Sequence, residues 1–215
     1  MVLQTSEPPT LFTATSAYSL AAVAFIGFVA KTAAGALLPK STRWQDKFAF
    51  IWLAFDAMIH FCFEGSFLYL STFGRSVNTS DGPFAELWKE YTRADFRWGV
   101  SDPTVVSLEI LTVLGAGPLC CYILYQLVRG DPARHYWIVV LSTAELYGGW
   151  MTFCPEWLTG SPNLDTSNAL YLYVYLIFMN VIWVFIPVWL MYDSYNHIAV
   201  SLRLARGAAA VSKKD

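Results

Sequence analysis

Charged side chains are scarce in this sequence. Only 14% of its 215 residues are Asp, Glu, Lys or Arg, whereas 56% are hydrophobic, and the mean hydropathy is +0.43. A soluble domain usually carries about 25% charged residues. Much of the surface of this chain must therefore face lipid. The formal net charge of −2 also provides no basic surface, so we expect no nucleic-acid partner.

Cysteine is rare as well, and its spacing excludes two kinds of site. The chain has 4 cysteines and no C-x-x-C motif, and Cys62, Cys120 and Cys121 lie inside apolar runs. We therefore expect neither a disulfide framework nor a cysteine-ligated metal site. The sequence also lacks a phosphate-binding loop, a dinucleotide fingerprint and a Ser-His-Asp arrangement, and no cofactor is expected.

Apolar runs, in contrast, are abundant. A helix needs roughly 20 apolar residues to cross the hydrocarbon core of a bilayer. Five runs approach or exceed this length, the fourth being the shortest: Ala17–Leu38, Phe48–Phe73, Thr104–Val128, Tyr136–Phe153 and Ala169–Tyr192. The pattern predicts an all-α membrane protein, a bundle of five transmembrane helices that encloses a lipid-accessible cavity.

The runs form one domain, because no internal repeat or low-complexity linker separates them. We expect an N-terminal tail at residues 1–16, the membrane domain at 17–197 and a C-terminal tail at 198–215. The polar segment 74–102 contains one further helix, whose N-cap we expect at Ser80 or Asp81 with Pro83 at its first turn. This helix has an apolar face and is expected to lie on the membrane surface or to cover the cavity.

The distribution of Lys and Arg predicts the orientation. These residues follow the first, third and fifth apolar runs, whereas the N-terminal tail and the loop after the fourth run have none. Cytoplasmic loops carry an excess of Lys and Arg. The sequence thus predicts a lumenal or external N-terminus and a cytoplasmic C-terminus. Segment 74–102 is an exception, since it also carries basic residues.

Several ionisable residues lie where lipid is expected. An ionisable residue costs about 2.5–3.5 kcal/mol at the bilayer centre, so residues that persist there usually line a cavity. The second run carries Asp56, His60 and Glu64 at intervals of four, which places them on one helical stripe. Glu109 lies in the third run. We expect His60, Glu64 and Glu109 to form one shared polar site.

The other polar residues in the runs have simpler interpretations. Asp56 is expected close enough to the interface to be solvated, and Glu145 near a membrane edge. Thr112 and Asn180 are open to two interpretations, either as site residues or as hydrogen-bonding contacts between helices.

The shared site has the composition of an acid–base centre. An apolar cavity favours the protonated form of a carboxyl group, and histidine titrates near neutrality, so such a group can both donate and accept protons. The π-face of Trp183 can stabilise a cation. His60 and the two glutamates are also a weak candidate for a metal site, but we expect no metal. An apolar substrate that enters from lipid fits the site best.

These residues lie in segments that resemble the emopamil-binding protein family, the sterol Δ8-Δ7 isomerases with an EXPERA-type membrane domain. The similarity runs in family order from about Phe48 to His197. The matching segments are Ile59-His60-Phe-Cys-Phe-Glu64-Gly65, Leu87-Trp88-Lys89-Glu90-Tyr91, Asp102-Pro-Thr-Val105 with Glu109 and Thr112, Leu146-Tyr147-Gly148, and Phe178-Met179-Asn180-Val-Ile-Trp183.

The resemblance implies a five-helix bundle that moves a double bond through a carbocation without a cofactor. It implies an acid–base role for His60, Glu64 and Glu109, an orienting role for Thr112 and Asn180, and contact of Trp183 with the cation. Tyr91, Trp98 and Tyr147 are implied as further substrate contacts. It also implies a sterol or terpenoid substrate, inhibition by cationic amphiphilic amines and a location in the endoplasmic reticulum membrane, and it leaves a homodimer open.

Three positions depart from the family pattern. Ser66 stands in place of Trp, Trp98 in place of Tyr, and Glu145 in place of Gln. These changes affect the identity of the substrate more than the type of reaction. The alternatives are a terpenoid cyclase or isomerase of the same superfamily, a non-catalytic sterol or amine binder, and a proton or ion transporter. The first and fifth runs offer few polar residues for a transport path.

Overall fold

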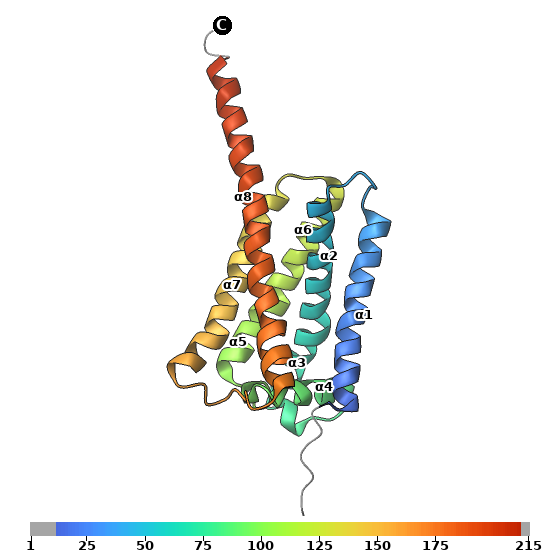
Figure 1. The fold of residues 1–215 in the computed structure, drawn as a ribbon, viewed down its shortest axis with the longest axis vertical. Coiled ribbons are helices and arrows are strands. Elements are labelled where there is room, and N and C mark those ends of the chain that lie inside the picture. Colours follow the sequence, from blue (N-terminus) through green and yellow to red (C-terminus); the bar gives the residue numbers. More distant parts are fainter. Residues whose placement is uncertain (1–11, 212–215) are drawn as a thin grey trace, which may run out of the picture.

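The computed structural model describes residues 12–211, and within this range the regular elements are all helical (Figure 1). The remainder of the two predicted tails, residues 1–11 and 212–215, lies outside the described residues. The α-helices are α1 Ala14–Leu37, α2 Trp44–Met58, α3 Gly65–Leu70, α4 Pro83–Thr92, α5 Pro103–Leu111, α6 Gly117–Arg129, α7 Arg134–Leu158 and α8 Met179–Val211. Short 3₁₀ turns cover η2 Val77–Thr79 and η3 Phe96–Trp98.

Three π-helical segments join these helices into longer runs. They are η1 Ile59–Glu64 between α2 and α3, η4 Thr112–Ala116 between α5 and α6, and η5 Leu170–Phe178 before α8. A π-helical turn widens a helix locally and is frequent at functional sites. Each of the three lies within a long apolar run, so the polar residues of that run leave the regular α-helical spacing.

Within residues 12–211, four helical runs are long and apolar enough to cross a membrane, namely Ala14–Leu37, Trp44–Leu70, Pro103–Arg129 and Leu170–Ala210. The chain is therefore a multi-pass membrane protein by length and composition. Helix α7 contains the remaining expected span, residues 136–153. It has 25 residues, enough to cross a bilayer, but carries many Trp, Tyr, Gly, Ser and Thr in place of aliphatic residues. A fifth crossing stays a prediction.

Local sequence explains where several helices begin and end. Thr13 and Ser16 form a reciprocal capping box at the start of α1, with Thr13 Oγ1 accepting from the Ser16 amide at 3.1 Å. Asp102 caps α5 by accepting from the amides of Thr104 and Val105, ahead of Pro103. Helix α6 ends at Gly130, whose φ of 67° suits glycine.

The helix in segment 74–102 is α4, and its expected N-cap was wrong. The N-cap is Gly82, with φ 105° and no side-chain hydrogen bond, because Pro83 takes the first helical position. A positive φ favours glycine over Ser80 or Asp81 at the residue where the chain turns into the helix. Figure 1 shows α4 lying across one end of the bundle, close to α3 and the start of α1.

Small residues allow α1 and α2 to approach closely. Ala30 and Ala34 of α1 and Ala49 and Ala57 of α2 are buried in the main apolar core. On its other side α2 packs against α6, and α7 packs along α8. Helix α8 continues past residue 198, where a tail was expected, and its last turns project beyond the bundle (Figure 1). The result is a bundle whose long helices run between two ends.

Candidate active site

A large cavity lies inside the bundle. Its volume is about 1360 Å³, and its lining is mostly apolar. Pockets for small ligands usually measure about 300–1,000 Å³, so this cavity suits a large apolar molecule. Its walls come from α1, α2, η1, α4, η3, α5, η4, α6, α7, η5 and α8. All nine residues predicted for the site line it: His60, Glu64, Tyr91, Trp98, Glu109, Thr112, Tyr147, Asn180 and Trp183.

His60 lies between two carboxylates. Its Nδ1 is 2.5 Å from Glu64 Oε2, and its Nε2 is 3.4 Å from Asp56 Oδ1. The residue is only 2% exposed. Nδ1 is hydrogen-bonded to Glu64, whereas Nε2 faces Asp56 without a hydrogen bond, so each ring nitrogen has a carboxylate nearby, an arrangement that favours a positively charged ring. The predicted stripe of three residues is therefore a chain of contacts centred on His60.

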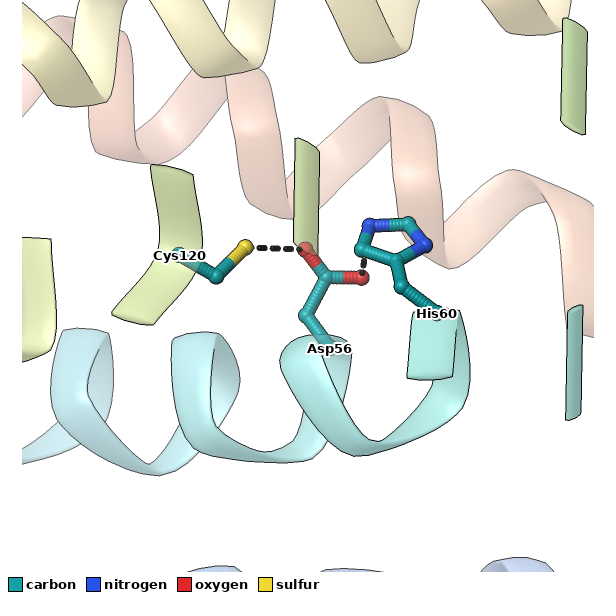
Figure 2. A group of neighbouring side chains, drawn as sticks. All are labelled: Asp56, His60 and Cys120. Carbon is teal, nitrogen blue, oxygen red and sulfur yellow. Dashed lines mark hydrogen bonds and ion pairs between the residues drawn. The ribbon is translucent and has the colours of Figure 1, made fainter. Parts of the chain in front are cut away.

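Asp56 was expected near the solvated interface, and this was wrong. The residue is 0% exposed, and its carboxylate lies between His60 and Cys120 (Figure 2). Oδ1 accepts a hydrogen bond from the indole N–H of Trp183 at 2.8 Å, and Oδ2 accepts one from the Cys120 thiol at 3.3 Å. Hydropathy gives the approximate depth of a residue, but it does not show which neighbours surround it.

Glu109 is the third member of the predicted acid–base set. It is 7% exposed, and the Thr112 hydroxyl donates to its Oε2 at 2.9 Å. Its carboxyl group is a neighbour of Glu64. Two like charges in contact inside an apolar cavity cannot both persist, so this pair is suited to share a proton. The structure thus brings His60, Glu64 and Glu109 together, with Thr112 against Glu109.

Glu145 was expected near a membrane edge, and its position corrects this. Both of its carboxyl oxygens are buried and have no N–H or O–H donor among residues 12–211. Their polar neighbour is the carboxyl group of Asp56. The sequence offered only one signal for this placement, a single acidic residue inside an apolar run.

Asn180 lines the cavity but does not reach the acid–base set. Its side-chain amide donates to the Tyr91 hydroxyl at 3.2 Å and to the carbonyls of Tyr175 at 2.9 Å and Leu176 at 3.1 Å. Those carbonyls belong to η5, so the Asn180 amide ties the start of α8 to the π-helical segment. Burial, with the nearby Asp95, raises the pKa of Tyr91, so the phenol stays protonated and can donate into the cavity.

Aromatic rings cover the end of the cavity beneath α4. Trp88 and Trp98 stack with centroids 4.9 Å apart and planes at 2°. The indole N–H of Trp88 donates to Ser66 Oγ at 3.0 Å, which gives the unusual Ser66 a structural role. Trp183 also lines the cavity and packs edge-on to Trp52, with ring centroids 5.2 Å apart. Tyr147 lines the cavity with one side only, since 63% of the residue is exposed.

One grouping in the site has the composition of a metal centre. Ligand atoms of Asp56, His60 and Cys120 lie within 4.8 Å of one another, and all three residues are buried. The hydrogen-bond pattern favours another state. Both Asp56 oxygens already accept donors, one of which is the Cys120 thiol, whereas a metal requires a thiolate. We read the grouping as a hydrogen-bonded network.

Comparison with known proteins identifies the family. The EXPERA (EXPanded EBP superfamily) family model matches residues 83–194, more than half of the chain. The chain belongs to the EXPERA family. It is 30% identical over 143 residues to the 3-beta-hydroxysteroid-Delta(8),Delta(7)-isomerase of Cavia porcellus and 31% identical over 153 residues to that of Rattus norvegicus. A protoglabretal synthase of Ailanthus altissima is 28% identical over 156 residues.

The alignments with these three relatives cover most of this chain but a smaller share of each relative. The aligned parts are 66%, 71% and 73% of this chain, and 61%, 65% and 69% of the guinea-pig, rat and Ailanthus proteins. The chain thus spans about two thirds of the length of these relatives. Three of the described site residues, Asp56, His60 and Glu64, precede the segment matched by the EXPERA model.

The local structure of this EXPERA chain explains how its site residues converge. His60 and Glu64 lie on η1, Glu109 and Thr112 lie where α5 gives way to η4, and Asn180 follows η5. Segments η1 and η4 contact each other. A Cβ atom on Gly117 would lie 2.9 Å from the ring of Phe61 and 3.3 Å from His60 Cβ. Glycine at this position allows the close approach that brings the carboxyl groups together.

Proposed function

We propose that this protein is a membrane-bound isomerase that moves a double bond within a sterol or similar polycyclic lipid. The observation that carries the proposal is the placement of an imidazole and two carboxyl groups in a large, mostly apolar cavity. Relatives named as Δ8-Δ7 isomerases support a sterol as the substrate.

The reaction needs one proton donor and one proton acceptor. A carboxylic acid of the set adds its proton to one alkene carbon, which leaves a carbocation and a carboxylate. A carboxylate of the set then removes a proton from a neighbouring carbon, and the electron pair of that C–H bond forms the new double bond. Atoms and charge balance without a cofactor. Thr112 would hold Glu109 in place through its hydroxyl group.

The surroundings would stabilise the cation midway through the reaction. Glu64 and Glu109 supply acceptors and negative charge, and Trp183 supplies a π-face. The same cavity would bind a lipophilic amine once it is protonated, because the ammonium resembles the intermediate. Tyr91, Trp98 and Tyr147 would contact the apolar body of the lipid. The amide of Asn180 supports Tyr91 and the η5 turn, so it would act on the substrate through them.

We further propose five membrane crossings, with the N-terminus lumenal, the C-terminus cytoplasmic and the endoplasmic reticulum as the membrane in a eukaryotic cell. The Lys and Arg pattern and the relatives' sterol chemistry support this location. A homodimer stays a prediction, to be tested by the mass of the detergent-solubilised protein.

The test is product analysis with purified protein in lipid nanodiscs. A Δ8-sterol should yield the Δ7-sterol, and in D₂O the product should gain deuterium at the newly protonated carbon. A second candidate, a terpenoid isomerase or cyclase, is favoured by the synthases among the relatives. Turnover of a triterpenoid or polyprenylated substrate without sterol turnover would replace the first proposal by the second. Binding of both substrate types without any product would leave a non-catalytic lipid binder.

A further inference from the structure

Glu145 and Asp56 form a pair of carboxyl groups at the cavity wall, where Glu145 lines the cavity and Asp56 lies outside its lining. Glu145 lies on α7 and Asp56 on α2, so the contact joins two helices that are distant in the chain. Asp56 is fully buried, and both oxygens of Glu145 are buried without a donor among the described residues. A buried carboxyl group without a donor calls for an explanation, because leaving it ionised and unpaired is costly.

The contacts show which carboxyl group holds the negative charge. Asp56 receives the Trp183 N–H and the Cys120 S–H and faces His60 Nε2, so its surroundings favour the carboxylate. Glu145 has no such donor, and its polar neighbour is Asp56 itself. Two adjacent buried carboxyl groups do not both ionise. These surroundings favour a protonated Glu145 beside an ionised Asp56.

We propose that Asp56 and Glu145 form a second proton-sharing pair, which holds His60 and Trp183 in position from the side opposite to the Glu64–Glu109 pair. This inference rests on the proposed acid–base function of His60. The His60 ring is then flanked by two similar units, with one pair at Nδ1 and the other at Nε2. Each unit carries one negative charge and one proton.

Asp56 and Glu145 act through their neighbours. Asp56 is fully buried, and although Glu145 lines the cavity, its carboxyl oxygens are buried, so both carboxyl groups would act on a lipid through other side chains. They are positioning residues. Asp56 orients the imidazolium and fixes the indole edge of Trp183, while the proton on Glu145 keeps a second negative charge away from this network.

Other titratable groups near Asp56, His60 and Glu145 can also contribute to the spectra and the pH profile. From each packed element these are Glu64 on η1, Glu109 on α5, Cys120 on α6 and Tyr91 on α4. Helices α1 and α8 contribute no charged group to the contacts of Asp56, His60 or Glu145. Variants must therefore distinguish the Asp56–Glu145 pair from the Glu64–Glu109 pair.

The first experiment detects the protonated carboxyl group of Glu145 directly and needs no substrate. Infrared difference spectra of purified wild-type protein and Glu145→Gln should show a protonated-carboxyl C=O band that the variant lacks and that shifts in D₂O. Glu109→Gln should remove a different band. The matched control is Glu156→Gln on the same helix, since Glu156 is buried but accepts from Asn163 at 2.8 Å and faces Arg97 at 3.7 Å. That control should leave the protonated-carboxyl bands unchanged.

The second experiment measures turnover against pH. Rising pH should remove the shared proton and place two negative charges side by side, which disturbs His60, so activity should fall at high pH. The amide of Glu145→Gln can donate to Asp56 and cannot ionise. The loss of turnover should therefore begin at a higher pH than in wild type or disappear. Asp56→Asn keeps an acceptor for Trp183 but loses the charge beside His60, and kcat should fall by about 10²-fold or more. Thermal unfolding checks that each variant folds.

The outcomes are separable. A spectrum of Glu145→Gln without a lost carboxyl band would overturn the pair, as would a pH profile that matches wild type. One equivalent of tightly bound zinc, lost in Cys120→Ala, would replace the pair by a metal centre at Asp56, His60 and Cys120. Absence of turnover with every lipid would refute the proposed function, while the infrared experiment would still decide the protonation of Glu145.

Discussion

At the scale of single residues, the acid–base set depends on contacts that one substitution can remove. We expect His60→Ala, Glu64→Ala and Glu109→Ala each to lower turnover by about 10²- to 10⁴-fold, because each removes a group that exchanges or positions the proton. The measurement is product formation from a Δ8-sterol. Glu86→Ala is the control, since Glu86 is exposed on α4 and pairs only with Lys89.

The comparison requires folded protein in every case. Thermal unfolding in detergent and retention in the membrane fraction check this for each variant. Turnover close to wild type in two of the three substitutions would refute the assignment of the set.

Trp183 gives a second prediction at this scale, on the binding of amines. Cation–π contacts contribute about 0.5–2 kcal/mol, so Trp183→Leu should weaken the binding of a lipophilic tertiary amine by roughly tenfold. Trp183→Phe should weaken it less, since a ring remains while the hydrogen bond to Asp56 is lost. Competition for a labelled ligand measures both. Trp44→Leu, an exposed Trp outside the cavity lining, is the control.

A neutral isostere, with carbon in place of nitrogen, separates charge from shape. The amine should bind more tightly than the isostere to wild type. Equal affinities would mean that the cavity does not recognise a cation, and the carbocation mechanism would lose its physical support.

The sequence alone predicted part of the site. His60, Glu64 and Glu109 were predicted to meet because their cost in lipid requires a common polar location, and the structure places them together. The same reasoning placed Asp56 and Glu145 wrongly. Their partners come from other helices, Trp183 on α8 and Cys120 on α6, and the packing of helices cannot be read from the spacing within one of them.

At the scale of elements, the close contact of η1 with η4 determines the geometry of the site. A methyl group on Gly117 would meet the ring of Phe61 at 2.9 Å and His60 Cβ at 3.3 Å, so Gly117→Ala should displace the Phe61 ring and crowd His60. Overpacking costs about 1–3 kcal/mol, and we expect lower thermal stability together with at least a tenfold loss of kcat. Gly27→Ala on α1 is the control, since nothing lies within 4 Å of its added Cβ.

The η5 turn gives a prediction on stability. Asn180 donates to two carbonyls and one hydroxyl, so Asn180→Ala leaves these acceptors without their donor. We expect a loss of about 1–3 kcal/mol, measured as a lower unfolding temperature. Asn180→Asp should lower the unfolding temperature further, because a carboxylate would face the same acceptors. Unchanged stability in Asn180→Ala would show that the amide does not support the turn.

The elements themselves were largely predictable, but the π-helical turns were not. Five apolar runs gave the long helices, because length and apolarity determine which segments can cross a bilayer. The position of a π-helical turn depends on side chains of neighbouring helices. This holds for η1, which shapes the contact of His60 with Glu64 although their spacing of four suggests a regular α-helix.

At the scale of the whole molecule, the basic residues gather at one end. The loops that join α1 to α2 and α6 to α7 lie at the end where α8 leaves the bundle (Figure 1), and they carry or flank Lys40, Arg43, Arg129 and Arg134. Ion pairs occur at both ends. Arg43 and Arg134 lie 3.0 Å and 3.3 Å from Asp46 at this end, and the opposite end also has basic residues with acidic partners. Lys89 lies 2.8 Å from Glu86, Arg93 lies 3.3 Å from Glu90 and Arg97 lies 2.6 Å from Asp95.

This asymmetry predicts both the orientation and the number of crossings. Helix α1 begins at one end of the bundle and α8 finishes beyond the other (Figure 1). The two termini can lie on opposite sides of a membrane only if the number of crossings is odd, which requires α7 to cross although it is less apolar than the other runs.

Glycosylation tags, fused separately to each end, test this in a eukaryotic host. We expect the N-terminal tag to be modified and the C-terminal tag to stay unmodified, because basic ends remain in the cytoplasm. Modification of only the C-terminal tag would reverse the orientation. Modification of both tags would mean an even number of crossings, and α7 would then have to lie outside the lipid as a helix packed against α8.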